Sequence, residues 1–292
     1  MWSVREALEK FIQRLELRPE EQKAVADQHT VVREALRQRL GSTDFLSGSY
    51  SRNTAIRPLH DIDLFIVLGN AASPPSTSPD AVLKQVRQAL HEKWPDKELP
   101  ILQRHSVHLD FSEKAIEFDV VPAFEQSGQQ AYFIPERQKE QQNERWIRTN
   151  PRLHQERSTE ANERAGKKLK PLLKAVKHWN RRQSSSPLGS FHLEVMSYSA
   201  FSQPPQAGYL ECMEALFSHL SRQVMLPCPD PAGLGPNVEG EMIPTQREAA
   251  RKLLESAART LQLVLSEEKT SPAQAHARMR GLFGEEYRDR GP

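Results

Sequence analysis

Residues 46–68, LSGSYSRNTAIRPLHDIDLFIVL, constrain the fold of this chain more than any other stretch. They predict a strand, a Gly-Ser turn, a polar connection and a second strand that opens on Asp61 and Asp63. Because strand residues two apart share a face, the two carboxylates lie side by side. The apolar run 64–68 indicates a strand buried on both faces within a mixed sheet. A lone D-x-D is more often a solvated strand edge. At the mouth of a buried strand, however, two like charges need a positive partner such as a divalent cation.

The Gly48-Ser49 turn has the composition of a phosphate site. Glycine lets backbone N–H groups come close to a phosphate because no Cβ is in the way, and Ser49 adds a hydroxyl. Eleven residues separate Ser49 from Asp61. A phosphate turn followed by a carboxylate pair predicts metal-assisted phosphoryl or nucleotidyl transfer.

A third carboxylate is expected, because two metal ions about 3.5–4 Å apart need more than two ligands. Asp119 is the favoured candidate, on a predicted strand over residues 116–121 whose apolar residues face away from it. Pro122 is expected to end or edge that strand. Asp110 is the alternative, in an apparent hairpin arm over residues 107–111.

The amino-acid composition limits the classes of protein to which this chain can belong. The formal net charge of the 292 residues is +2, so a nucleic-acid wrapper with a global cationic field is not expected. No apolar run approaches 18 residues, which predicts a cytoplasmic chain without a membrane segment. The two cysteines, Cys212 and Cys228, have no His or Cys partner at zinc spacing and are interpreted as reduced packing residues.

The order of predicted elements indicates an α+β fold. Two N-terminal helices, the second over residues 19–40, are expected to brace the sheet from outside. A helix over residues 80–94 and strands over 99–104, 107–111 and 116–121 complete a catalytic palm. The polar residues 125–150 are interpreted as a connection, and the chain is predicted to be helical from Pro151. The predicted domains are therefore residues 1–150 and 151–292.

A basic segment within residues 153–183 permits two interpretations. Lys170, Lys174 and Lys177 share one face of a predicted helix, opposite an apolar face. They form either a solvated basic surface or a surface that neutralises a triphosphate opposite the carboxylates. Ser190 is predicted as a helix N-cap because Glu194 and a helical run follow it.

Two sequence patterns resemble one known family. The first pattern is G-S-Y-x-R-x-T-A-I-R-P-L-x-D-I-D with a later F-D-V-V-P, and the second is L-L-K-A-V-K-H-W-N with G-S-F-H-L-E. In both patterns the chain resembles the CD-NTases, bacterial cGAS/DncV-like enzymes of the DNA polymerase β-like nucleotidyltransferase superfamily. The resemblance implies a nucleotidyltransferase palm and a C-terminal helical lobe with the active site between them. It also implies N-terminal helices that form a spine across both lobes.

The same resemblance implies an activity and the residues that perform it. Nucleoside triphosphates, with ATP foremost, would be joined into a cyclic di- or trinucleotide messenger in bacterial anti-phage (CBASS) defence. Asp61 and Asp63 would bridge two Mg²⁺ ions, with Mn²⁺ as a substitute. Asp119 would hold the ion that activates the attacking hydroxyl. Lys177 would bind the triphosphate and Ser190 a phosphate.

The expected partners are a downstream effector that binds the product and a regulatory protein. Activation by double-stranded DNA is not expected, because the zinc-bearing thumb of animal cGAS has no counterpart in the sequence. Three other functions remain open: a template-independent RNA or tRNA nucleotidyltransferase, a protein-modifying nucleotidyltransferase, and a nucleotide-binding module without activity.

Overall fold

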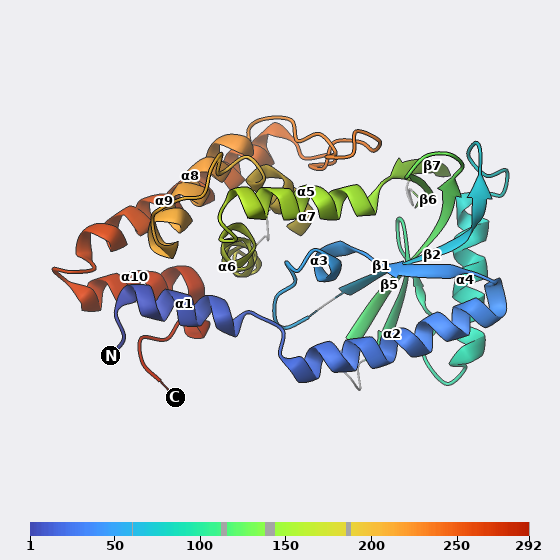
Figure 1. Cartoon of the computed structure of the whole chain (residues 1–292), viewed down its shortest axis with the longest axis horizontal. Coiled ribbons are helices and arrows are strands. Elements are labelled where there is room, and N and C mark those ends of the chain that lie inside the picture. The colour runs from blue at the N-terminus through green and yellow to red at the C-terminus, as the bar shows by residue number, and fades with distance from the viewer. Residues whose placement is uncertain (60, 112–115, 138–143, 185–187, 292) are drawn as a thin grey trace.

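The chain folds into a β-sheet lobe and a helical lobe (Figure 1). The computed structural model describes residues 1–59, 61–111, 116–137, 144–184 and 188–291. The sheet lobe contains α2 (Pro19–Leu40), β1 (Thr43–Leu46), α3 (Gly48–Ser51), β2 (Asp61–Ala71), α4 (Pro79–Lys93), β3 (Ile101–Leu102), β4 (Val107–Phe111), β5 (Ile116–Gln126), β6 (Tyr132–Arg137) and β7 (Glu144–Thr149). The helical lobe contains α1 (Val4–Arg14), α5 (Pro151–Arg164), α6 (Leu169–Arg181), α7 (Ser190–Ser197), α8 (Tyr209–Gln223), α9 (Pro244–Glu267), α10 (Pro272–Phe283) and a 3₁₀ turn (Gly284–Glu286).

The sheet is mixed, as predicted. Its order is β1-β2-β5-β4-β3, and β6 joins the far end of β5 and pairs with β7. β2 and β5 run parallel, whereas the other pairs are antiparallel. The α+β prediction is therefore confirmed.

The strand that follows the two aspartates is buried on both faces, as its apolar run predicts. Leu64 and Ile66 are fully buried and pack in the core under α2 and α4. Phe65 points to the opposite face, where it contacts Phe45 and Tyr132. Packing on both faces anchors β2 within the sheet and so positions the residues that open the strand.

Pro122 does not end β5, although it lies at an edge position as the other alternative predicted, and the segment after β5 is not a plain connection. β5 continues through Pro122 to Gln126, because Pro122 lies between the last β4 pair, at Val120, and the first β6 pair, at Phe124. On this side Pro122 therefore lies at an open edge, while on the other side it stays in register with Ile66 of β2. The polar segment 125–150 also contains the strands β6 and β7, whereas a plain connection was expected; of this segment, residues 138–143 lie outside the described ones.

The two N-terminal helices belong to different lobes. α2 begins at Pro19 and ends before Gly41, which adopts the left-handed conformation. As expected, α2 packs on the sheet through Val25, Val32 and Leu36. α1 does not brace the sheet: its buried residues join the core of the helical lobe, and α1 lies beside α10 (Figure 1). The N-terminal helices thus extend along both lobes, in agreement with the spine that the resemblance implies.

The helical lobe begins where β7 ends, with Pro151 at the start of α5. Its core unites α1 with the helices from α5 to α10. Among the described residues, no helix combines the length and the hydropathy that a membrane crossing requires.

Candidate active site

Three aspartates converge where β2 and β5 run side by side. The register places Asp63 opposite Asp119 and Asp61 opposite Glu117. Since partners in register share a face, all four carboxylates lie on one side of the sheet. Asp110 lies on β4, opposite Glu117, and is therefore one strand further from Asp61 and Asp63 than Asp119 is. The structure therefore brings Asp119, rather than Asp110, beside the two aspartates.

The carboxylates are close enough to perturb one another. Burial, followed by the charge of Asp119, raises the pKa of Asp63 to about 6. Burial likewise raises the pKa of Asp119, against a hydrogen bond from His108. Ligand atoms of Asp61, Asp119 and His108 all lie within 4.8 Å of one another. A set of crowded, under-neutralised oxygen donors fits a hard divalent cation such as Mg²⁺.

His108 is a residue that sequence analysis missed at this site. It lies on β4 opposite Asp119, and its Nδ1 is 2.9 Å from Asp119 Oδ1. This hydrogen bond fixes the orientation of the carboxylate, as partners of metal ligands commonly do. The alternation of β4 could have revealed it, because His108 and Asp110 share a face.

Gly48 allows the predicted phosphate turn to lie directly against the aspartates. Its φ is +63°, and a Cβ on this residue would lie 1.5 Å from Asp63 Oδ2. The turn is also tied to β2, because the Ser47 N–H donates to the Asp63 carbonyl at 2.8 Å. The carbonyl of Ser49 accepts the N–H groups of residues 54 and 55, which closes the loop behind the turn. Only glycine fits this position without displacing a carboxylate.

Lys177 lies in a buried ion-pair network that joins the lobes. It is 3% exposed, and its Nζ donates to Glu194 and to the carbonyl and hydroxyl of Thr54. Arg52 donates to the other side of Glu194 at 2.8 Å. Burial acts against ionisation of Glu194, but Lys177 and Arg52 lower its pKa to about 2. We refer to Arg52, Thr54, Lys177 and Glu194 as the interlobe network.

The charges of the interlobe network also act on the aspartates. The positive charge of Arg52 opposes the rise in the pKa of Asp63. Arg52 and Thr54 belong to the motif after the Gly-Ser turn, and Glu194 belongs to the second motif. The sequence motifs contain these residues, but they indicate no role for Arg52 and Thr54, and for Glu194 they indicate only the start of a helix.

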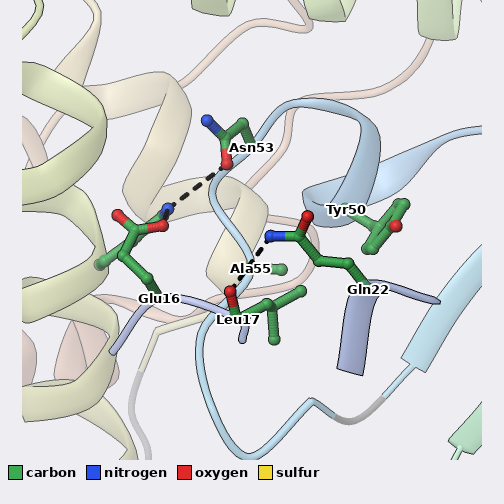
Figure 2. A pocket seen from close by; sticks show the side chains of 7 residues that line it. Glu16, Leu17, Gln22, Tyr50, Asn53 and Ala55 are labelled. Atoms are coloured by element: carbon green, nitrogen blue, oxygen red, sulfur yellow. Dashed lines mark hydrogen bonds and ion pairs between the residues drawn. The ribbon is translucent and has the colours of Figure 1, made fainter. Parts of the chain in front are cut away.

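A second buried lysine excludes the simple solvated-surface interpretation of the basic helix. Lys174 is 2% exposed and pairs with Glu16, with Asn53 Oδ1 at 3.4 Å. Glu16 and Asn53 face the same cavity of about 220 Å³, which α3, the α1–α2 connection and α6 enclose (Figure 2). Lys170 on the same helix is half-buried, and it has no carboxylate within ion-pair distance among the described residues. Of the three lysines on this face, Lys170 is thus the one that no salt bridge between described residues holds.

Ser190 belongs to the helical lobe. It is the first residue of α7, whereas Gly189 occupies the N-cap position that was predicted for it. Ser190 lines a cavity of about 680 Å³ between β6, β7 and the helical lobe, and none of the three aspartates lines this cavity. A cavity of this size accommodates a small ligand.

The chain has a polymerase β-like nucleotidyltransferase fold. Three features define this fold: a mixed sheet, two aspartates on one strand with a third on the parallel neighbouring strand, and a Gly-Ser turn that lies against them. Comparison with known proteins identifies the family. Residues 2–162 match the SMODS family, the Second Messenger Oligonucleotide or Dinucleotide Synthetase domain. The chain belongs to this family and is a CD-NTase, as the sequence motifs predict.

Individual relatives agree with this assignment. The chain is similar to the cyclic AMP-AMP-AMP synthase of Acinetobacter sp. (strain ATCC 27244 / 9458), with 32% identity over 171 residues. This match covers 54% of the chain and 46% of that protein, so the chain spans about half the length of this relative.

Two solved structures show the same fold across both lobes. Escherichia coli MS115-1 CdnC, solved in complex with HORMA-deltaN, has a TM-score of 0.77 at 17% identity, covering 97% of this chain and 98% of CdnC. Vibrio cholerae DncV cyclic AMP-GMP synthase has a TM-score of 0.78 at 13% identity, covering 99% and 98%.

Proposed function

We propose that the chain is a metal-dependent cyclic oligonucleotide synthase that joins nucleoside triphosphates into a cyclic di- or trinucleotide. The observation that carries the proposal is the convergence of Asp61, Asp63 and Asp119 beside the Gly48 turn. Membership of the SMODS family supports it. The name of the Acinetobacter relative favours ATP as a substrate.

In the proposed reaction, a ribose hydroxyl oxygen attacks the α-phosphorus of a second nucleotide. The new P–O bond replaces the bond from the α-phosphorus to the bridging oxygen, and pyrophosphate leaves with that electron pair. For a dinucleotide, a second transfer, in which the terminal hydroxyl attacks the remaining 5′ α-phosphorus, closes the ring and releases another pyrophosphate. For a trinucleotide, one more nucleotide is added in the same way, with release of its pyrophosphate, before the ring closes. The hydroxyl proton passes to solvent in each step.

Each site residue has a proposed part in this transfer. Asp61 and Asp63 would hold two Mg²⁺ ions, and Asp119, oriented by His108, would complete the ligand set. Bound there, the ions would acidify the hydroxyl and stabilise charge on the transferring phosphate. Gly48 and Ser49 would present N–H and hydroxyl groups to the donor phosphates.

Lys177 and Ser190 remain proposed phosphate ligands. Lys177 would have to exchange a contact in the interlobe network for a phosphate oxygen, because Glu194 and Thr54 occupy its Nζ. Lys170 is the additional candidate for the triphosphate tail, since no carboxylate of the described residues forms a salt bridge with it.

The wider setting that we propose is bacterial anti-phage signalling in the cytoplasm, where nucleoside triphosphates are available. A downstream effector would bind the cyclic product. The complex of the similar CdnC with HORMA-deltaN supports a regulatory protein partner for this chain. We do not expect double-stranded DNA to activate it.

The experiment is incubation with all four nucleoside triphosphates and Mg²⁺ or Mn²⁺, followed by phosphatase treatment and mass spectrometry. A phosphatase-resistant cyclic product is expected, and the Asp61→Asn/Asp63→Asn double variant should make none while remaining folded. Label found instead on added tRNA or on a polypeptide would favour the alternative transferases. Synthesis that persists in the double variant would refute the metal assignment.

A further inference from the structure

A histidine, a cysteine and a glutamate meet in the helical lobe, outside the catalytic site. His192 lies in the first turn of α7, Cys228 follows α8, and Glu239 lies in the loop before α9. Their ligand atoms all lie within 4.8 Å of one another. We propose that His192, Cys228 and Glu239 bind a divalent metal ion of the zinc class, which fastens the loop of residues 227–243 to the start of α7.

The histidine is the observation that points to a ligand. His192 is 3% exposed, and its Nε2 is buried without a hydrogen-bond partner among the described residues. A buried polar atom without a partner costs about 1–3 kcal/mol, so such atoms are rare unless something binds them. A metal ion bound through the imidazole ring would supply the missing partner.

The other two ligands are held in place by the loop itself. The Cys228 N–H donates to Glu239 Oε2 at 3.0 Å, and the Val238 N–H donates to the Cys228 carbonyl at 2.8 Å. Asp230 accepts three further N–H groups within the loop. These bonds fix Cys228 and Glu239 on facing segments, so binding an ion requires little reorganisation.

The donor types select the class of metal. Imidazole nitrogen, thiolate sulfur and carboxylate oxygen are the three ligand types of Zn²⁺, whereas Mg²⁺ and Ca²⁺ take oxygen ligands. Three protein ligands leave one position of a tetrahedral ion open. His192 lines the 680 Å³ cavity, from which a water can reach that position.

Charge in the site also permits an ion. On binding, the Cys228 thiol would release its proton to solvent, so that a thiolate and the Glu239 carboxylate face the two charges of the ion together with the charge of Arg247, which pairs with the same carboxylate. Arg247 donates to Glu239 Oε1 at 2.9 Å, and Asn237 donates to the same atom at 3.2 Å. A carboxylate offers about four lone-pair sites, so the three hydrogen bonds to Glu239 leave it able to ligate.

The amino-acid sequence does not predict this cluster. Cys228 lies 36 residues after His192 and 11 before Glu239, a spacing that matches no zinc pattern. The three residues meet only because α8 returns the chain to the start of α7. The site does not depend on the proposed nucleotidyl transfer.

The test is optical titration of the full, chelator-stripped chain with Co²⁺, which replaces Zn²⁺ and is coloured. Wild type should show a sulfur-to-cobalt charge-transfer band that Zn²⁺ abolishes. The catalytic aspartates cannot produce this band because they offer no sulfur. Cys228→Ser should lose the band, and Cys212→Ser is the matched control because it removes the other buried cysteine.

A second variant keeps the test independent of the folding of Cys228→Ser. His192→Gln retains the thiol and should bind Co²⁺ about tenfold more weakly or worse, since even outer partners of metal ligands contribute 10–100-fold. Zn²⁺ should raise the midpoint of thermal unfolding of wild type and Cys212→Ser by several degrees, and that of His192→Gln by less at the same Zn²⁺ concentration. Absence of the band in wild type, its loss in Cys212→Ser, or unchanged affinity in His192→Gln would overturn the proposal.

Discussion

Replacing Asp63 with asparagine should abolish transfer and yet stabilise the metal-free protein. Burial and the charge of Asp119 raise the pKa of Asp63 from 3.8 to about 6. Each pH unit between the unfolded and folded values corresponds to about 1.4 kcal/mol. At neutral pH the ionised Asp63 therefore destabilises the fold by about 3 kcal/mol, and an asparagine of nearly the same shape removes that penalty.

The pH dependence of this gain distinguishes electrostatics from packing. Because the folded pKa is raised, the penalty is absent below pH 3.8, grows as the pH rises and is complete above about 6. The stability gain of Asp63→Asn should be about 3 kcal/mol at pH 7.5 and only about 1 kcal/mol at pH 4.5.

Urea unfolding in EDTA at the two pH values measures both gains. Asp110→Asn is the matched control, because Asp110 shares the sheet face but is exposed. Mg²⁺ or Mn²⁺ should then stabilise wild type and have little effect on Asp63→Asn. A variant that is less stable than wild type at pH 7.5, or a gain that does not shrink at pH 4.5, would refute the electrostatic argument.

Three further predictions concern the Gly48 turn and the interlobe network. Gly48→Ala should abolish activity and weaken Mn²⁺ binding, because the added Cβ meets the Asp63 carboxylate. Gly41→Ala is the control: Gly41 has the same φ of +63°, and no atom of the described residues beyond its chain neighbours lies within 4 Å of its Cβ, so this variant should only lose about 1–2 kcal/mol of stability. Equal activity of the two variants would contradict this prediction. Glu194→Gln should destabilise the protein by about 3–5 kcal/mol, because it leaves the buried charges of Lys177 and Arg52 unmatched, and Lys177→Ala should raise the KM for ATP. Urea unfolding and steady-state kinetics measure these effects, and an unchanged KM would restrict Lys177 to the ion pair.

The palm could be predicted from the sequence because the residue patterns that indicate it are local. The apolar run after Asp63 indicates a strand buried on both faces, and alternation places Asp119 on one face of its own strand. The preference for Asp119 over Asp110 agrees with the register, which sets Asp119 directly beside Asp63. Pro19 and Gly41 delimit α2 because each has a fixed conformational role at a helix end.

The remaining features depend on contacts distant in sequence. Glu136 on β6 is 1% exposed because Arg104 and Arg145 pair with it, and a polar composition does not reveal such pairing. The amphipathic pattern of α1 predicts burial but not the lobe that buries it. Lys177 likewise belongs to a basic face by sequence, whereas Glu194 on another helix draws it into the interior.

The most direct test of the central claim compares pyrophosphate release by wild type, Asp119→Asn and Asp110→Asn under identical conditions. The two aspartates lie on neighbouring strands of one sheet face, but only Asp119 is in register with Asp63. We predict that Asp119→Asn reduces the rate by about 100-fold or more, as expected for loss of a group that stabilises transition-state charge, while Asp110→Asn stays close to wild type. Equal rates in the two variants would contradict the assignment of Asp119 to the metal site.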